Sequence, residues 1–145
     1  MKKFVFLPIA LIFAAIASVN AQSKLTLEIS GIDNPTGSLY VALYDAQSPF
    51  LGKNNYSGKI VGISNNIMEV GLDNVADGQY AIAIFQDENQ NGKLDMGQWG
   101  IPTEKYGFSN NVDPAIIKRP PSFEECKFEV KGDSRIEINL MSAIK

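Results

Sequence analysis

The sequence predicts an all-β protein: a single Greek-key β-sandwich of about seven strands with one long ordered loop. Apolar and polar residues alternate with a period of two through much of the chain after residue 22. Clusters of Gly, Asn, Asp and Pro separate these segments at the spacing of turns. That part of the chain shows no i, i+3, i+4, i+7 apolar stripe, so the strands must bury their apolar faces against one another.

The first 21 residues have the composition of a secretory signal peptide. Two lysines precede an apolar run over 4–17, and Val19 and Ala21 are small residues three and one positions before a cut. The run is shorter than the ~20 residues of a spanning helix, so it is a poor membrane anchor. We expect a signal peptide at 1–21 and one domain at 22–145. We also expect export to the periplasm or the extracellular space, and no membrane span in the mature chain.

Composition argues against several classes of function. The chain has 13 Lys and Arg and 16 Asp and Glu, and removal of the two signal-peptide lysines leaves 11 against 16, a net charge of −5. This charge repels phosphate backbones, so we expect no nucleic-acid partner. The chain has no histidine, which removes His general bases, Ser-His and Cys-His pairs and His-ligated zinc. The single cysteine cannot form an intrachain disulfide.

Four strands are predicted in the first half of the domain. They are residues 25–29, 38–44, 59–63 and 67–72. Leu25, Leu27 and Ile29 alternate with polar residues, which is the pattern of a half-buried strand. The last two of the four strands are separated only by the polar residues 64–66, so we expect them to form a hairpin.

A fifth strand is predicted at residues 80–85, Tyr-Ala-Ile-Ala-Ile-Phe. This continuous apolar run is typical of a central strand buried on both faces. The Gly78-x-Tyr80 step at its start admits two roles for Tyr80. The tyrosine is either a corner residue whose hydroxyl bonds to nearby backbone or an ordinary cross-strand residue.

The alternation returns at the end of the chain, in residues 126–130 and 136–140. Because only the turn at 131–133 separates these segments, we expect a terminal hairpin. Cys126 alternates in phase with Phe128 and Val130, so we predict that it is a small buried hydrophobic residue rather than a reactive thiol.

The strand pattern stops between Phe85 and Phe123, and compact domains rarely contain so long an irregular segment without a function. The segment begins with residues 87–95, Asp-Glu-Asn-Gln-Asn-Gly-Lys-Leu-Asp. Oxygen-bearing side chains at positions 1, 3, 5 and 9, with glycine at position 6, are the layout of a short calcium-binding loop. The predicted Ca²⁺ ligands are the side chains of Asp87, Asn89, Asn91 and Asp95 and the carbonyl of Lys93.

The loop is not an EF-hand, because its twelfth position is Gln98 instead of a bidentate glutamate. Two carboxylates among the ligands predict weak binding, with a Kd of about 10⁻⁴ to 10⁻³ M. Glu104 and Asp113 are candidates for further ligands. The alternative is a tight turn without an ion, which Asp, Asn and Gly also favour.

The remainder of the segment, residues 99–102 and 106–111, mixes aromatic residues with glycine and amides. These residues either line a groove for a sugar or peptide, or fold inward as a lid over an open end of the sandwich. We favour the lid, which predicts that Trp99 and Tyr106 contribute to stability.

Five short motifs follow one another along the chain. They are Gly37-x-Leu39-x-Val41-Ala42-Leu43-Tyr44, Gly78-x-Tyr80-Ala81-Ile82, Asp87-x-Asn89-x-Asn91-Gly92-x-Leu94-Asp95, Gly100-x-Pro102 and Tyr106-Gly107-Phe108-Ser109-Asn110-Asn111. With these motifs the chain resembles the bacterial domain-of-unknown-function family 2141 over nearly all of the mature part. The resemblance implies an exported all-β domain like the transthyretin (prealbumin) sandwiches, and it implies no activity. An Ig-like sandwich is the other form of the predicted fold.

The leading interpretation is an exported, non-catalytic sandwich that binds calcium structurally and presents its long loop to a partner protein or to the cell envelope. A small-ligand carrier is an alternative that a large apolar pocket near Trp99 would favour. A carboxylate-based hydrolase is another, because it needs two carboxylates about 5 to 9.5 Å apart. The acidic residues available for such a pair are Asp87, Glu88, Asp95, Glu104 and Asp113.

Overall fold

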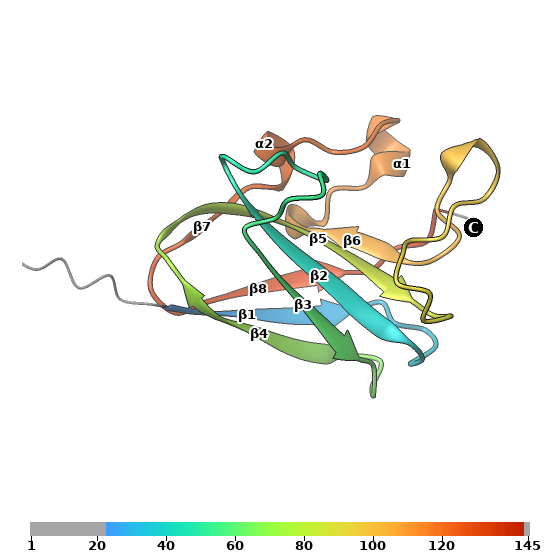
Figure 1. Ribbon diagram of the computed structural model, residues 1–145, viewed down its shortest axis with the longest axis horizontal. Helices are drawn as coiled ribbons and strands as arrows, with labels where there is room; N and C mark the ends of the chain where they lie inside the picture. The colour runs from blue at the N-terminus through green and yellow to red at the C-terminus, as the bar shows by residue number, and fades with distance from the viewer. Residues whose placement is uncertain (1–22, 144–145) are drawn as a thin grey trace, which may run out of the picture.

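The computed structural model describes residues 23–143, so the predicted signal peptide lies outside the described residues. Two β-sheets pack face to face in this range (Figure 1). Sheet A has the order β4-β1-β8, made of β4 (Met68–Val75), β1 (Ser23–Ser30) and β8 (Ser134–Asn139). Sheet B has the order β3-β2-β5-β6, made of β3 (Ser57–Gly62), β2 (Ser38–Asp45), β5 (Gly78–Asp87) and β6 (Tyr106–Phe108). β7 (Phe128–Val130) pairs with the start of β5. The predicted all-β sandwich is confirmed.

The core between the sheets comes from alternate positions of the strands, as the period-two pattern predicts. It includes Leu25, Leu27 and Ile29 of β1, Leu39, Val41 and Leu43 of β2, and Ile82 and Ile84 of β5. All of these side chains are buried. The intervening residues of β2 and β5 therefore point to the opposite face of sheet B, away from sheet A.

β5 is the central strand that its apolar sequence predicts. It pairs with β2 along its length, with β6 near its end and with β7 at its start. Of the two roles that the sequence left open for Tyr80, the structure has the corner residue, because the hydroxyl donates to the carbonyl of Ala76 at 3.0 Å. Desolvation by burial, followed by the neighbouring Tyr56, raises the pKa of Tyr80 to about 12.

The hairpin predicted from residues 59–63 and 67–72 is wrong. β3 pairs with β2 in sheet B, whereas β4 pairs with β1 in sheet A. The short connection passes from one sheet to the other, and the side-chain amide of Asn66 donates to the carbonyl of Ile32 at 2.6 Å. This bond ties the crossing to the β1–β2 connection. The short polar linker between β3 and β4 therefore connects the two sheets instead of two neighbouring strands of one sheet.

The predicted terminal hairpin is also wrong. β7 lies in sheet B, and β8 pairs with β1 in parallel in sheet A. The turn between them is held by two hydrogen bonds, one from the amide of Gly132 to the carboxylate of Asp77 and one from the amide of Lys24 to the carboxylate of Asp133, both at 2.9 Å. Cys126 is buried as predicted, but it ends a helical turn instead of beginning a strand.

The helices of the described part are single turns. They are η1 (Gln98–Gly100), η2 (Ser109–Asn111), α1 (Pro114–Ile117) and α2 (Phe123–Cys126). Figure 1 shows α1 and α2 on the side of sheet B that faces away from sheet A. Cys126 of α2 packs there in a second apolar cluster with Ala81, Tyr106 and Phe108. No helix within residues 23–143 is long and apolar enough to cross a membrane.

Candidate functional site

Three small residues lie side by side across the outer face of sheet B. Gly58 of β3 is opposite Ala42 of β2, and Ala42 is opposite Ala83 of β5. Because neighbouring strands are about 4.8 Å apart, the three residues form a trough about 10 Å long that runs across the strands. Phe108 of β6 is opposite Ala83 and stands at the end of this row.

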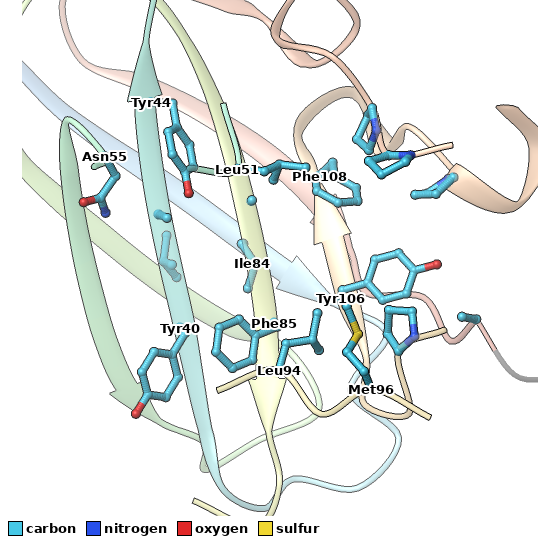
Figure 2. Close-up of a pocket in the computed structure, with 18 of the residues that line it drawn as sticks. Tyr40, Tyr44, Leu51, Asn55, Ile84, Phe85, Leu94, Met96, Tyr106 and Phe108 are labelled. Atoms are coloured by element: carbon cyan, nitrogen blue, oxygen red, sulfur yellow. The ribbon is translucent and has the colours of Figure 1, made fainter. Parts of the chain in front are cut away.

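Aromatic side chains border the trough on both sides. Tyr40 and Phe85 are opposite each other on β2 and β5, and their rings stack with centroids 4.8 Å apart and an angle of 14°. Tyr44 lies on the other side of Ala42 and meets Phe50 edge to face at 5.2 Å. Figure 2 shows Tyr40 beside Phe85, with Tyr44 farther along β2. The small residues therefore form a floor between two aromatic ridges.

Loops raise walls around this floor and complete a groove of about 1160 Å³. One wall contains Leu94, Met96 and Ile101, from the segment that follows β5. Others come from Leu51 in the β2–β3 connection and from residues 114–121 around α1. Figure 2 shows Leu94 and Met96 with Phe85 and Tyr106 around the same part of the groove. The lining is predominantly apolar.

Large apolar side chains are exposed around the rim. Met96 is 58 % exposed and Ile60 is 61 % exposed, and both line the groove. Leu51 and Lys118, which also line it, have left-handed backbone angles with φ near 60°. Residues other than glycine seldom adopt this conformation, and such strain is concentrated at functional sites. Exposed apolar groups around a concave surface mark a binding site.

The expectation that Trp99 is part of a lid is wrong. Its side chain is 93 % exposed, and its backbone is left-handed with φ 63°. The turn that carries it is closed by a hydrogen bond from the amide of Gly97 to the carbonyl of Ile101 at 2.7 Å, so the indole projects from the tip of a tight turn. Tyr106, in contrast, is buried on β6 and lines the groove.

Asp87 of the predicted calcium loop is fully buried at the end of β5. Its carboxylate accepts from the backbone amides of Asn91 at 3.1 Å and Gly92 at 2.8 Å. Gly92 has φ +81°, the conformation that the turn requires. Asp87 thus holds the middle of the loop against the end of the strand.

The other side chains of the loop gather around Asp95. The side-chain amides of Asn89 and Asn91 donate to its carboxylate at 2.6 and 2.9 Å. These two hydrogen bonds, that of Asn91 first, lower the pKa of Asp95. Lys93 belongs to the same turn, and its backbone amide donates to the side-chain oxygen of Asn91 at 3.1 Å. The structure therefore brings Asn89, Asn91 and Asp95 together and ties Asp87 to the same loop.

Glu104 and Asp113, the candidates for further ligands, have other contacts. The Glu104 carboxylate is buried and accepts from the amides of Glu88 at 2.9 Å and Asp95 at 3.0 Å, so it joins the two ends of the loop. The Asp113 carboxylate caps α1 by accepting from the amide of Ala115 at 2.8 Å. Within residues 23–143 no group of three or more Asp, Glu or Cys side chains gathers at a metal-binding spacing.

The loop and the groove are one structural unit. Leu94, between two residues of the predicted ion site, lines the groove, and so does Met96. A bridge between Met96 and Pro102, and a hydrogen bond from the amide of Thr103 to the carbonyl of Asp95 at 2.9 Å, close the segment into a flap. The shape of the 87–95 loop thus determines where one wall of the groove stands.

Sequence reasoning missed the floor of the groove. The run 80–85 indicated burial on both faces, and the pattern alone did not show that Ala83 opens onto a groove rather than onto another element. A partial signal was present, since Ala42 lies between two tyrosines, Tyr40 and Tyr44, on the same face of its strand, although Ala83 has a larger neighbour of this kind only at Phe85. Their alignment with Gly58 depends on register, which period-two alternation does not specify.

A family model described as "Uncharacterized protein conserved in bacteria (DUF2141)" matches residues 27–139. The chain belongs to this family. The match confirms the resemblance inferred from the motifs, and it includes the 87–95 loop and the floor of the groove. No curated protein and no solved structure matches the chain. The family description states no activity.

Proposed function

We propose that this protein is an exported, non-catalytic binding module that holds an apolar ligand in the groove on the outer face of sheet B. The supporting observation is a groove of about 1160 Å³ with an apolar floor and exposed apolar side chains at its rim. The groove is separate from the core between the sheets, whose side chains are closely buried. It is therefore not a gap in the packing of the sandwich, and a carrier is the function that such a concave apolar surface favours.

The chemistry of the groove supports binding without catalysis. Its lining contains no aspartate, glutamate or cysteine. The carboxylates of Asp87 and Glu104 accept backbone hydrogen bonds and so act in holding the loop. Cys126 is buried, and desolvation raises the pKa of its thiol to about 12, which keeps it protonated and unreactive. A general base or nucleophile would have to come from tyrosine or lysine.

We also propose that the 87–95 loop binds Ca²⁺ and that the ion stabilises the flap beside the groove. The side chains of Asn89, Asn91 and Asp95 already meet, and the Asp95 carboxylate accepts hydrogen bonds that a cation would replace. The lowered pKa of Asp95 keeps this carboxylate ionised. An extracytoplasmic location, which the first 21 residues indicate, would supply calcium at a concentration suited to a weak site.

The exposed Trp99 gives the flap a second surface for a partner. An indole that is 93 % exposed at the tip of a turn is well placed to contact an envelope component or another protein. This proposal uses a different surface from the groove and is separable from it by mutation.

Binding of a neutral fluorescent dye tests the main proposal. Titration of the mature protein with Nile red is expected to give saturable fluorescence enhancement, which Ala42→Leu reduces strongly because the leucine fills the centre of the trough. Ala46→Leu is the matched control, because residue 46 is exposed and lies outside the groove. The proposal is wrong if the dye does not bind, or if it binds the Ala42→Leu protein as it binds the wild type.

A further inference from the structure

We infer that the ligand of the groove is a single-chain anionic amphiphile, with its linear alkyl chain in the trough and its acidic head group beside Lys118. The inference rests on the proposed function, since it assigns a chemical class to the ligand of the same groove. Shape, polarity and charge each support it.

The trough has the shape of a channel for one chain. Its floor is the row Gly58, Ala42 and Ala83, which runs across the strands. Tyr40 and Tyr44 stand on either side of Ala42, four residues apart on β2, or about 13 Å along the strand. The two aromatic side chains occupy part of this distance, so the space between them over Ala42 is a narrow slot. A linear chain lying across the strands fits such a slot along its length.

The centre of the floor offers no side-chain hydrogen bonds, and the amide of Asn55, which stands over Gly58, already donates to the carbonyl of Ser57 at 3.0 Å. Glycine and alanine form its centre, and the bordering rings of Phe85 and Phe108 are apolar. A sugar or a peptide buried on this surface would leave its polar groups without partners, which is costly. An alkyl chain has no such groups. The floor therefore selects an aliphatic ligand over the sugar or peptide that the aromatic residues and amides of the long segment first suggested.

The charge of the groove is opposite to that of the whole protein. The chain has an excess of three acidic residues, yet the charged residues that line the groove are Lys59, Lys118 and Arg119, with no carboxylate among them. Two of the three are engaged elsewhere. Lys59 donates to the carbonyl of Gly71 at 2.8 Å, and Arg119 forms an ion pair with Glu125 at 2.7 Å.

Lys118 is the cation left for a ligand. No carboxylate in residues 23–143 pairs with it, and its side chain is exposed. Its backbone is fixed at the end of α1, where φ is 60° and the amide donates to the carbonyl of Pro114 at 2.8 Å. An anionic head group beside this ammonium would gain an ion pair without first breaking one.

The position of α1 sets the direction of the chain. Val112, which directly precedes the N-cap of α1, packs against the apolar cluster that contains Tyr106 and Phe108 of β6, so the start of α1 lies beside β6. The head group of the ligand is therefore at the β6 side of the groove, and the alkyl chain runs along the row from Ala83 to Gly58. β3 is the edge strand of sheet B, and the side chain of Asn55 stands over Gly58 at this end of the trough.

Calorimetric titration with decanoate, decan-1-ol and decyltrimethylammonium, all below the concentrations at which they aggregate, tests the inference. Decanoate is expected to bind most tightly and the cation most weakly. Shortening decanoate to octanoate is expected to weaken binding about fourfold for each methylene lost, which corresponds to ~0.8 kcal/mol per buried methylene.

Two matched lysine variants isolate the head-group contact. Lys118→Gln is expected to weaken decanoate binding by up to about fivefold, as for an exposed ion pair, and to leave decan-1-ol binding unchanged. Lys131→Gln removes the same charge from the exposed turn between β7 and β8 and is expected to change neither. Thermal melting of both variants checks that they are folded.

The outcomes separate this inference from the proposed function. If decan-1-ol binds as tightly as decanoate, or if Lys118→Gln leaves decanoate binding unchanged, the anionic head group is wrong while the apolar carrier stands. If none of the three amphiphiles and no Nile red binds, both are wrong. Binding to vesicles of anionic phospholipid without binding of monomeric decanoate would also overturn the inference, because the groove would then be a membrane-contact surface.

Discussion

Replacement of Asp95 by asparagine gives a sharp test of calcium binding by the 87–95 loop. Asp95 is partly exposed, and the side chains that contact its carboxylate are the amides of Asn89 and Asn91. Its loss removes one of the two carboxylates of the predicted site and breaks no buried contact. The effect of the substitution on stability is therefore expected to depend on calcium.

The expected magnitude follows from mass action. With a Kd of about 0.1 mM and about 1 mM free calcium, binding stabilises the native state by RT ln 11, or about 1.4 kcal/mol. For a domain of about this size each kcal/mol shifts the melting temperature by roughly 4 °C, so calcium is expected to raise it by about 6 °C. Asp95→Asn should remove most of that increase while melting close to the wild type in the presence of chelator.

Asp87 makes an informative contrast. Its buried carboxylate accepts two backbone hydrogen bonds, so Asp87→Ala leaves two amides unsatisfied and costs about 3 kcal/mol or more even without the ion. The Asp87→Ala protein should therefore melt at a lower temperature than the wild type both in calcium and in chelator. Only Asp95→Asn distinguishes the stabilisation by the ion from the stability of the fold without it.

Differential scanning calorimetry in calcium, in magnesium and in excess EGTA provides the measurement. A wild-type melting temperature that does not change between calcium and EGTA would refute the reasoning. So would a calcium-dependent increase that persists unchanged in Asp95→Asn, because the ion would then bind elsewhere.

Three further predictions concern the long segment and α2. Trp99→Ala should leave the melting temperature nearly unchanged, because an indole that is 93 % exposed has little packing to lose; a large decrease would restore the lid. Cys126 should react with a thiol reagent at pH 8 only after unfolding, because its pKa is raised to about 12; rapid reaction of the native protein, followed by absorbance, would contradict this. The pKa of Glu125 is lowered from 4.5 to about 2, first by Arg119 and then by Ser122. Its stabilising effect is therefore complete above about pH 4.5 and lost as the pH falls toward 2, and Arg119→Ala should raise that pKa in an NMR titration.

The link between loop and groove has a functional consequence. Leu94 and Met96 line the groove and belong to the flap whose shape the loop determines. Glu104 fixes both ends of the loop through the amides of Glu88 and Asp95. A ligand and an ion that stabilise the same flap favour each other's binding. We therefore expect calcium to raise the affinity of the groove for an apolar ligand. Dye titrations with calcium and with EGTA measure this coupling directly.

Several features could be predicted from the sequence because they depend on local chemistry. Alternation located the strands other than β6, which lies in the segment where the pattern stops, and the apolar run 80–85 identified the central strand. Gly78-x-Tyr80 admitted the corner hydrogen bond that Tyr80 makes to Ala76 as one of two roles. The spacing of oxygens in 87–95 indicated a curled loop, and Asn89, Asn91 and Asp95 do meet there. Each of these follows from neighbours in the chain.

The tertiary structure decided which strand pairs with which, and hence where the groove lies. Both predicted hairpins failed because alternation shows which face of a strand is buried but not which sheet the strand joins. Trp99 projects outward because a hydrogen bond between Gly97 and Ile101 closes the tight turn that carries it. The composition of the segment did not show this turn. Gly58, Ala42 and Ala83 come from three strands, and they form a floor only because the packing of the whole sandwich sets the register of β3, β2 and β5.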